Sequence, residues 1–142
     1  MNRTALFAAF GLALVAATAA PAKADQRVEG RWTLDLDATI AAAKTAGLPP
    51  ADVAQMHQDL TPLAQGFVMT FTGKRLEVNA GPDTTKCDWT WGKNDFLTPS
   101  KCLDQNGKPN DLDAEREQIK LVSGQLHLIN KPSNLVLILR RQ

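Results

Sequence analysis

The chain has 142 residues, of which 44% are hydrophobic, and its 16 lysines and arginines nearly balance its 15 aspartates and glutamates. This length supplies one hydrophobic core and excludes two full-sized domains. Charges of both signs alternate along the sequence, whereas binding to nucleic acids or acidic membranes needs clustered basic residues. We therefore expect neither kind of partner.

Residues 1–24 have the pattern of a cleavable signal peptide. An uncharged, alanine-rich run of 16 residues follows the cationic start at Arg3, and Ala22 and Ala24 supply the small residues of a cleavage site. The run is shorter than the roughly 20 residues of a membrane-spanning helix, so we expect no membrane anchor. Cleavage after Ala24 would release residues 25–142 as one domain, periplasmic or secreted, with a net charge near −1 because two basic residues and no acidic one are removed.

The first elements of the mature chain are a strand and a helix. Alternation over residues 28–36 puts Trp32 on the same face as the two leucines that follow, which predicts a half-buried strand. Asp37 or Thr39 can then cap a helix that ends at Gly47.

A second helix completes a predicted helical pair over residues 38–65. Pro50 suits its first turn, and Pro62 should interrupt or restart it. Its apolar stripe is too narrow to form a core alone, so we expect the pair to cover one opening or flank of a sheet. The stripe consists of Val53, Met56, Leu60 and Leu63.

From Phe67 onward the two-residue period returns, and it predicts a meander of short strands. Residues 99–117 are polar and are expected to form a long loop, with a helical turn near 113–117. About eight strands in this order predict a mainly β fold, an antiparallel sheet closed into a barrel, with a two-sheet sandwich as the alternative. After the first, the expected strands are 67–71, 75–80, 84–91, 96–98, 118–122, 125–130 and 135–140.

The two cysteines, Cys87 and Cys102, are expected to form a structural disulfide. Paired cysteines are usual in exported domains, and this pair lacks the Cys-x-x-Cys spacing of redox-active sites. A loop of this length contributes about 3 kcal/mol in the chain-entropy description.

The sequence resembles lipocalin-like families at Gly30-Arg31-Trp32 and at Arg140, which ends the last expected strand. In those barrels a Gly-x-Trp motif places the tryptophan at the closed end, and an arginine of the last strand packs over it. The resemblance implies these structural roles for Trp32 and Arg140, and a barrel interior that holds a small apolar ligand.

Trp89 and Trp91 are the most prominent candidates for ligand contact. They share a strand face with Cys87 and can either stack on a ligand or fill the core beside the disulfide. Phe67 and Met69 are the other two candidate ligand contacts.

Residues typical of catalysis or metal binding are sparse. His57 and His127 are expected to be structural, and no histidine or cysteine spacing is typical of a metal site. A calcium loop starting at Asp104 fails because Lys108 and Pro109 occupy its fifth and sixth positions. We therefore expect no enzyme activity, no cofactor and no metal.

Together these features predict a monomeric, non-enzymatic domain that binds a small apolar ligand. The alternative is a protein-binding module, such as an inhibitor or an envelope accessory protein, that acts through the 99–117 loop.

Overall fold

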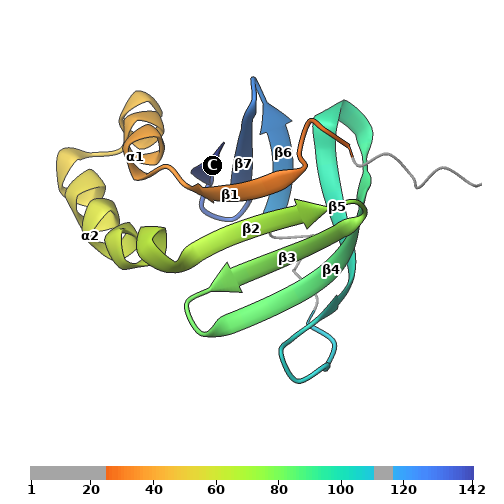
Figure 1. Cartoon of the computed structure of the whole chain (residues 1–142). Coiled ribbons are helices and arrows are strands. Elements are labelled where there is room, and N and C mark those ends of the chain that lie inside the picture. Colours follow the sequence, from red (N-terminus) through yellow and green to blue (C-terminus); the bar gives the residue numbers. More distant parts are fainter. Residues whose placement is uncertain (1–24, 111–116) are drawn as a thin grey trace, which may run out of the picture.

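The computed structural model describes residues 25–110 and 117–142, and it shows an antiparallel barrel that eight strands close in sequence order (Figure 1). The closed barrel expected from the sequence is confirmed, and two helices follow the first strand. The elements are β1 (Gly30–Leu34), α1 (Leu36–Thr45), α2 (Pro50–Gly66), β2 (Phe67–Thr72), β3 (Arg75–Ala80), β4 (Asp83–Trp91), the 3-10 turn η1 (Lys93–Asp95), β5 (Phe96–Leu103), β6 (Glu117–Val122), β7 (Gln125–Asn130) and β8 (Leu135–Arg141).

The barrel closes where β1 pairs with β8. Trp32 lies opposite Arg141 and Leu34 lies opposite Leu139. The pairing continues one step further, because the backbone N–H of Asp35 donates to the carbonyl of Ile138 at 2.8 Å. Closure gives each of the eight strands a hydrogen-bonded neighbour on both sides.

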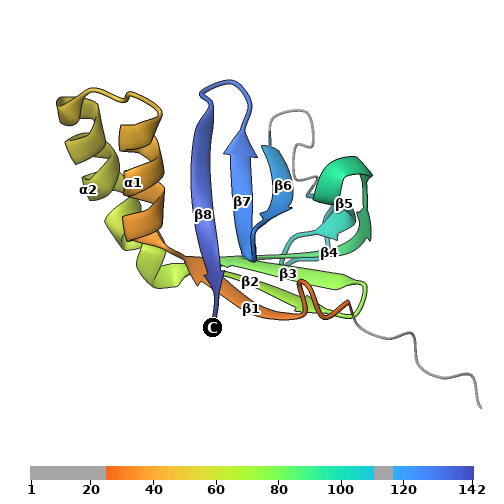
Figure 2. The ribbon, with the colours of Figure 1, turned by 90° about the horizontal axis from the view of Figure 1, so that it is seen from above.

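Helix α1 begins earlier than the sequence suggested. Its N-cap is Asp35, whose carboxylate accepts a hydrogen bond from the N–H of Ala38 at 3.0 Å, so the expected caps Asp37 and Thr39 were wrong. Strand β1 passes into the helix without a loop, and Thr39 is thereby carried into the interior. Its fully buried hydroxyl accepts a hydrogen bond from the N–H of Ile138 at 2.9 Å and so fixes α1 to β8 (Figure 2).

Helix α2 runs unbroken through Pro62, contrary to the expected interruption. A proline removes one helical hydrogen bond, but the helix on either side of it remains intact. Val53 and Leu60 are buried, and Thr61 donates a hydrogen bond to the carbonyl of His57 at 2.6 Å. The two helices lie together at one flank of the barrel, with α1 alongside β8 (Figure 2).

Strand β5 extends to Leu103, so the first residues of the expected 99–117 loop are in the sheet. The disulfide between Cys87 and Cys102 is present and joins β4 to β5 beside a register shift. This covalent link explains why β5 pairs with β4 further along the chain than expected. The chain then turns tightly around Asp104, whose carboxylate accepts hydrogen bonds from two backbone N–H groups. Most of the expected helical turn at 113–117 lies outside the described residues.

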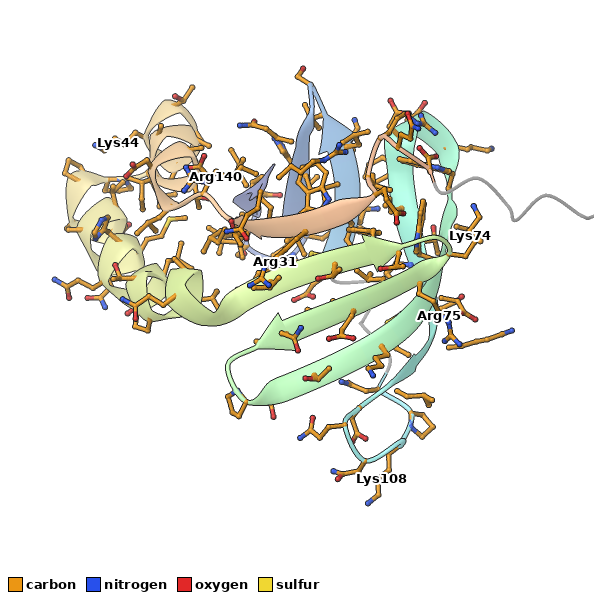
Figure 3. The ribbon with its side chains drawn as sticks, viewed as in Figure 1. Arg31, Lys44, Lys74, Arg75, Lys108 and Arg140 are labelled. Carbon is orange, nitrogen blue, oxygen red and sulfur yellow. A yellow bond between two sulfur atoms is a disulfide. The ribbon has the colours of Figure 1, made fainter. Side chains whose placement is uncertain are left out.

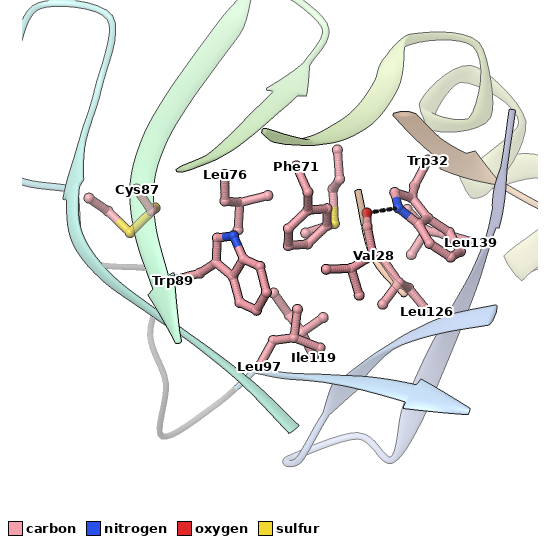
Figure 4. Close-up of a cluster of buried hydrophobic side chains, with 12 residues drawn as sticks. Val28, Trp32, Phe71, Leu76, Cys87, Trp89, Leu97, Ile119, Leu126 and Leu139 are labelled. Carbon is pink, nitrogen blue, oxygen red and sulfur yellow. Dashed lines mark hydrogen bonds between the residues drawn. A yellow bond between two sulfur atoms is a disulfide. The ribbon is translucent and has the colours of Figure 1, made fainter. Parts of the chain in front are cut away.

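The inward-facing side chains of the barrel form one apolar core, and Figure 4 shows most of them in close contact. Its largest fully buried members are aromatic, and each buries far more apolar area than an aliphatic residue does. The core consists of Val28, Trp32, Met69, Phe71, Leu76, Cys87, Trp89, Leu97, Cys102, Ile119, Leu126 and Leu139.

Candidate functional site

The two ends of the barrel differ in how they are filled. We call one the closed end: it carries the β2–β3, β4–β5 and β6–β7 turns and is covered by the segment Asp25–Glu29. The opposite, open end carries the start of β2, the end of β7 and the start of β8, and helix α2 ends beside it (Figure 1).

Val28 and Trp32 plug the closed end, and neither side chain is exposed to solvent. The indole Nε1–H of Trp32 donates to the carbonyl of Val28 at 2.8 Å (Figure 4). The N–H of Gly73 in the β2–β3 turn donates to the carboxylate of Glu29 at 3.0 Å. The segment is therefore held both to the first strand and to the neighbouring β2–β3 turn.

The cation over Trp32 is Arg141, and the expected role of Arg140 was wrong. The Arg141 guanidinium lies 4.9 Å from the indole centroid and donates to the carbonyls of Gln26 and Arg27. Because Trp32 pairs with Arg141, these two side chains share a face, and Arg140 points to the opposite face and is exposed (Figure 3). A shift of one residue along a strand reverses the face.

Trp91 lies at the closed end and is half-buried under the N-terminal segment. Its Nε1–H donates to the carboxylate of Asp25 at 2.5 Å, and the Arg27 guanidinium lies 4.1 Å from its ring centroid. Hydrogen bonds from Arg27, and then from Trp91, lower the pKa of Asp25 to about 2. The carboxylate thus remains ionised and keeps the segment in place.

Trp89 is buried in the core and is not among the described residues that line the barrel cavity. Its indole N–H donates to the carbonyl of Gly73 at 3.0 Å, and its ring meets Phe71 and Trp91 edge to face, at centroid distances of 5.5 and 5.4 Å. Trp89 therefore belongs to the core, and Trp91 packs against it. This was the alternative to ligand contact that the sequence left open.

The open half of the barrel contains a cavity of about 280 Å³. Phe67 and Met69, two of the four candidate ligand contacts, lie in its wall. Most of the remaining lining is aliphatic and comes from β3, β6, β7, β8 and the end of α2. The other lining residues are Leu63, Val78, Pro99, Glu117, Ile119, Leu128, Ile129, Asn130, Leu135 and Leu137.

The cavity wall includes residues of β5 and β6, two strands that pair over a short stretch in the described chain. Within the described residues, these strands pair only where Phe96 and Leu97 meet Lys120 and Ile119. Beyond that point the cavity is lined by Pro99, which has no backbone N–H to offer a neighbouring strand, and by Glu117.

The histidines lie away from the cavity. His57 is exposed on α2, and His127 is on the outward face of β7, opposite Lys120 on β6. Burial, and secondarily the charge of Lys120, lower the pKa of His127. Within residues 25–110 and 117–142 no group of three or more histidine, cysteine or acidic side chains could hold a metal ion, and no helix there is long and apolar enough to cross a membrane.

A second apolar groove, of about 430 Å³, lies outside the barrel between α1, α2 and the β7–β8 turn. Leu48, Met56 and Leu60 contribute to it, and Leu48 is one of the two large hydrophobic residues exposed in the described chain. Apart from Leu135 and Val136 at the start of β8, its lining comes from the two helices, the segment that joins them and the β7–β8 turn, and it is more open to solvent than the barrel cavity.

Most of the residues that line the cavity were not predicted from the sequence, although the sequence pattern indicates which face of the strand some of them share. Alternation in β6 and β7 puts Glu117 on one face with Ile119, and Leu128 on one face with Asn130. The alternation does not indicate how far along the barrel axis a residue lies. It therefore does not distinguish inward residues in the filled half of the barrel from those in the hollow half.

No family profile matches the sequence, and no curated protein matches it. Among solved structures, the chain is similar to a DUF4847 family protein from Bacteroides vulgatus, with 12% sequence identity and a TM-score of 0.47. The match covers 82% of this chain and 95% of that one. A likeness at this level carries no argument about function.

Proposed function

We propose that the mature chain is an exported, monomeric, lipocalin-like binding protein that holds a small apolar molecule in the open half of its barrel. The observation that carries this proposal is the 280 Å³ cavity with aliphatic and aromatic walls, opposite a barrel end occupied by buried side chains. Barrels of eight strands either fill with side chains or hold one small ligand. In this barrel, side chains occupy one half and the cavity occupies the other.

The size of the cavity limits the ligand. At roughly 30 Å³ for each atom the size of a water molecule, it holds about nine non-hydrogen atoms. Burying eight carbons at about 0.8 kcal/mol each offers roughly 6 kcal/mol. This gain alone corresponds to a dissociation constant of about 0.04 mM, and the cost of ordering the ligand raises the expected value into the millimolar range.

The disulfide supports the exported location. It indicates an oxidising compartment outside the cytoplasm, because cytoplasmic thiols are kept reduced. Asp25, the first residue after the proposed cleavage site, contacts Trp91 and Arg27 in the fold. Intact mass of the protein recovered from its host should give residues 25–142 with no free thiol, and a retained leader would contradict the exported state.

The test of binding uses 1-octanol, which has nine non-hydrogen atoms and no charge. We expect saturable binding of one molecule to residues 25–142, measured by isothermal titration calorimetry. Val78→Trp places an indole in the cavity and should weaken binding at least tenfold. Val68→Trp is the matched control, because Val68 lies between two inward residues of β2 and faces outward.

Leu128→Trp gives a second cavity-filling variant on another strand, in case Val78→Trp does not fold. Circular dichroism checks the fold of each variant. Equal octanol binding by the cavity-filling variants and by Val68→Trp would refute binding inside the barrel.

A further inference from the structure

The cavity has a polar rim on one side. Glu117 begins β6 and Asn130 ends β7, and the two lie directly opposite each other in the register. Both line the cavity, and Glu117 is the one ionisable side chain among its described lining residues. Residues opposite each other in antiparallel strands have Cβ atoms about 5 Å apart, so one polar group of a ligand can reach both.

The hydrogen-bonding atoms of this rim are not equivalent. The Oδ1 atom of Asn130 accepts from the N–H and the hydroxyl of Ser133, at 3.1 and 2.8 Å, in the β7–β8 turn. That turn does not use the two N–H donors of the same amide. The Glu117 carboxylate, by contrast, only accepts hydrogen bonds when ionised.

From this rim we infer the class of ligand: an apolar molecule of about nine non-hydrogen atoms whose polar end donates hydrogen bonds, an ammonium or a hydroxyl, and not a free carboxylate. The inference rests on the proposed function. An ammonium group at the mouth donates to Glu117 and is attracted by its charge. A hydroxyl donates to Glu117 and accepts from Asn130. A carboxylate accepts from Asn130 but meets the like charge of Glu117.

The expected preference is modest, because Glu117 is exposed and solvent screens it. An exposed ion pair changes a dissociation constant by up to about fivefold. We expect attraction and repulsion to separate octylammonium from octanoate by about tenfold, and 1 M salt to remove most of that difference.

The experiment measures binding of octylammonium, 1-octanol and octanoate to residues 25–142 at pH 7 by calorimetry. In Glu117→Gln, we expect octylammonium to bind about threefold more weakly, octanoate about threefold more tightly, and octanol within twofold of the unmodified protein. Glu77→Gln is the matched control. Glu77 lies on the outward face of β3, its Oε2 is 3.9 Å from Nζ of Lys86, and it is outside the cavity lining, so this substitution should change none of the three affinities.

The outcomes separate this inference from the proposed function. Octanol binding that Val78→Trp removes, together with octanoate binding as tight as octylammonium, would overturn the ligand class and leave the binding function standing. An unchanged ratio of the two charged probes in Glu117→Gln would do the same. Failure of octanol to bind would refute the function, and the ligand class with it.

Discussion

Replacing Arg141 with alanine should destabilise the fold, whereas replacing its neighbour Arg140 should not. Arg141 closes the barrel end: its guanidinium lies 4.9 Å from the Trp32 centroid and donates to the carbonyls of Gln26 and Arg27. Arg140 is exposed on the opposite strand face. The two residues have the same type, strand and charge, so each is the natural control for the other.

The magnitude follows from the contacts that are lost. A cation–π contact near the surface contributes about 0.5–1 kcal/mol. Hydrogen bonds from a charged donor to backbone carbonyls add about 1 kcal/mol here, toward the low end because Arg141 is exposed. We expect Arg141→Ala to lower the free energy of unfolding by about 1.5–2 kcal/mol, and Arg140→Ala to change it by less than about 0.5 kcal/mol.

Urea unfolding of residues 25–142, followed by tryptophan fluorescence, measures both values. With a slope of about 1.5 kcal/mol per molar urea, Arg141→Ala should lower the midpoint by roughly 1 M without a change in slope. An equal or larger loss in Arg140→Ala would show that the register of β1 with β8, and the plug built on it, are incorrect.

Three further changes test separate parts of the fold. Replacing Cys87 and Cys102 together with alanine should lower the free energy of unfolding by about 3 kcal/mol, and an unchanged urea midpoint would contradict this. The Asp25 carboxylate has a pKa lowered from 3.8 to about 2, so its stabilisation is complete above pH 3.8 and declines as the pH falls toward 2. Asp25→Asn should therefore be less stable than the unmodified protein at pH 6 and equal to it near pH 2, and a gap that persists at pH 2 would refute this linkage. Thr39→Val leaves the buried N–H of Ile138 without its 2.9 Å partner and should cost about 1–3 kcal/mol, whereas Thr45→Val on the exposed side of α1 should cost much less.

Strand order and barrel closure could be predicted because each depends on alternation and turn residues. Local geometry was harder to predict from the sequence. The Asp35 cap was missed because strand and helix join without a loop, and the face of Arg140 was misassigned because a strand offers no local signal that distinguishes adjacent arginines. The extension of β5 was missed because its residues are polar, although the disulfide at Cys102 holds them in the sheet.

Only part of the candidate site could be predicted from the sequence, for a related reason. Phe67, Met69, Trp89 and Trp91 all point inward, but position along the barrel axis decides whether an inward residue packs in the core or lines the hollow. The N-terminal segment fills one end with Val28, and the tryptophans lie in that half. The pairing of strands that are distant in the sequence sets the position of a residue along the barrel axis. The periodicity within one strand does not indicate that position.

The most direct test of the binding account is to locate octanol on the protein by methyl NMR. Intermolecular nuclear Overhauser effects should connect the octyl chain to the methyl groups of Met69, Val78 and Leu128, which line the barrel cavity. Effects confined to Leu48 and Met56 would place the ligand in the outer groove beside the helices and would contradict binding inside the barrel.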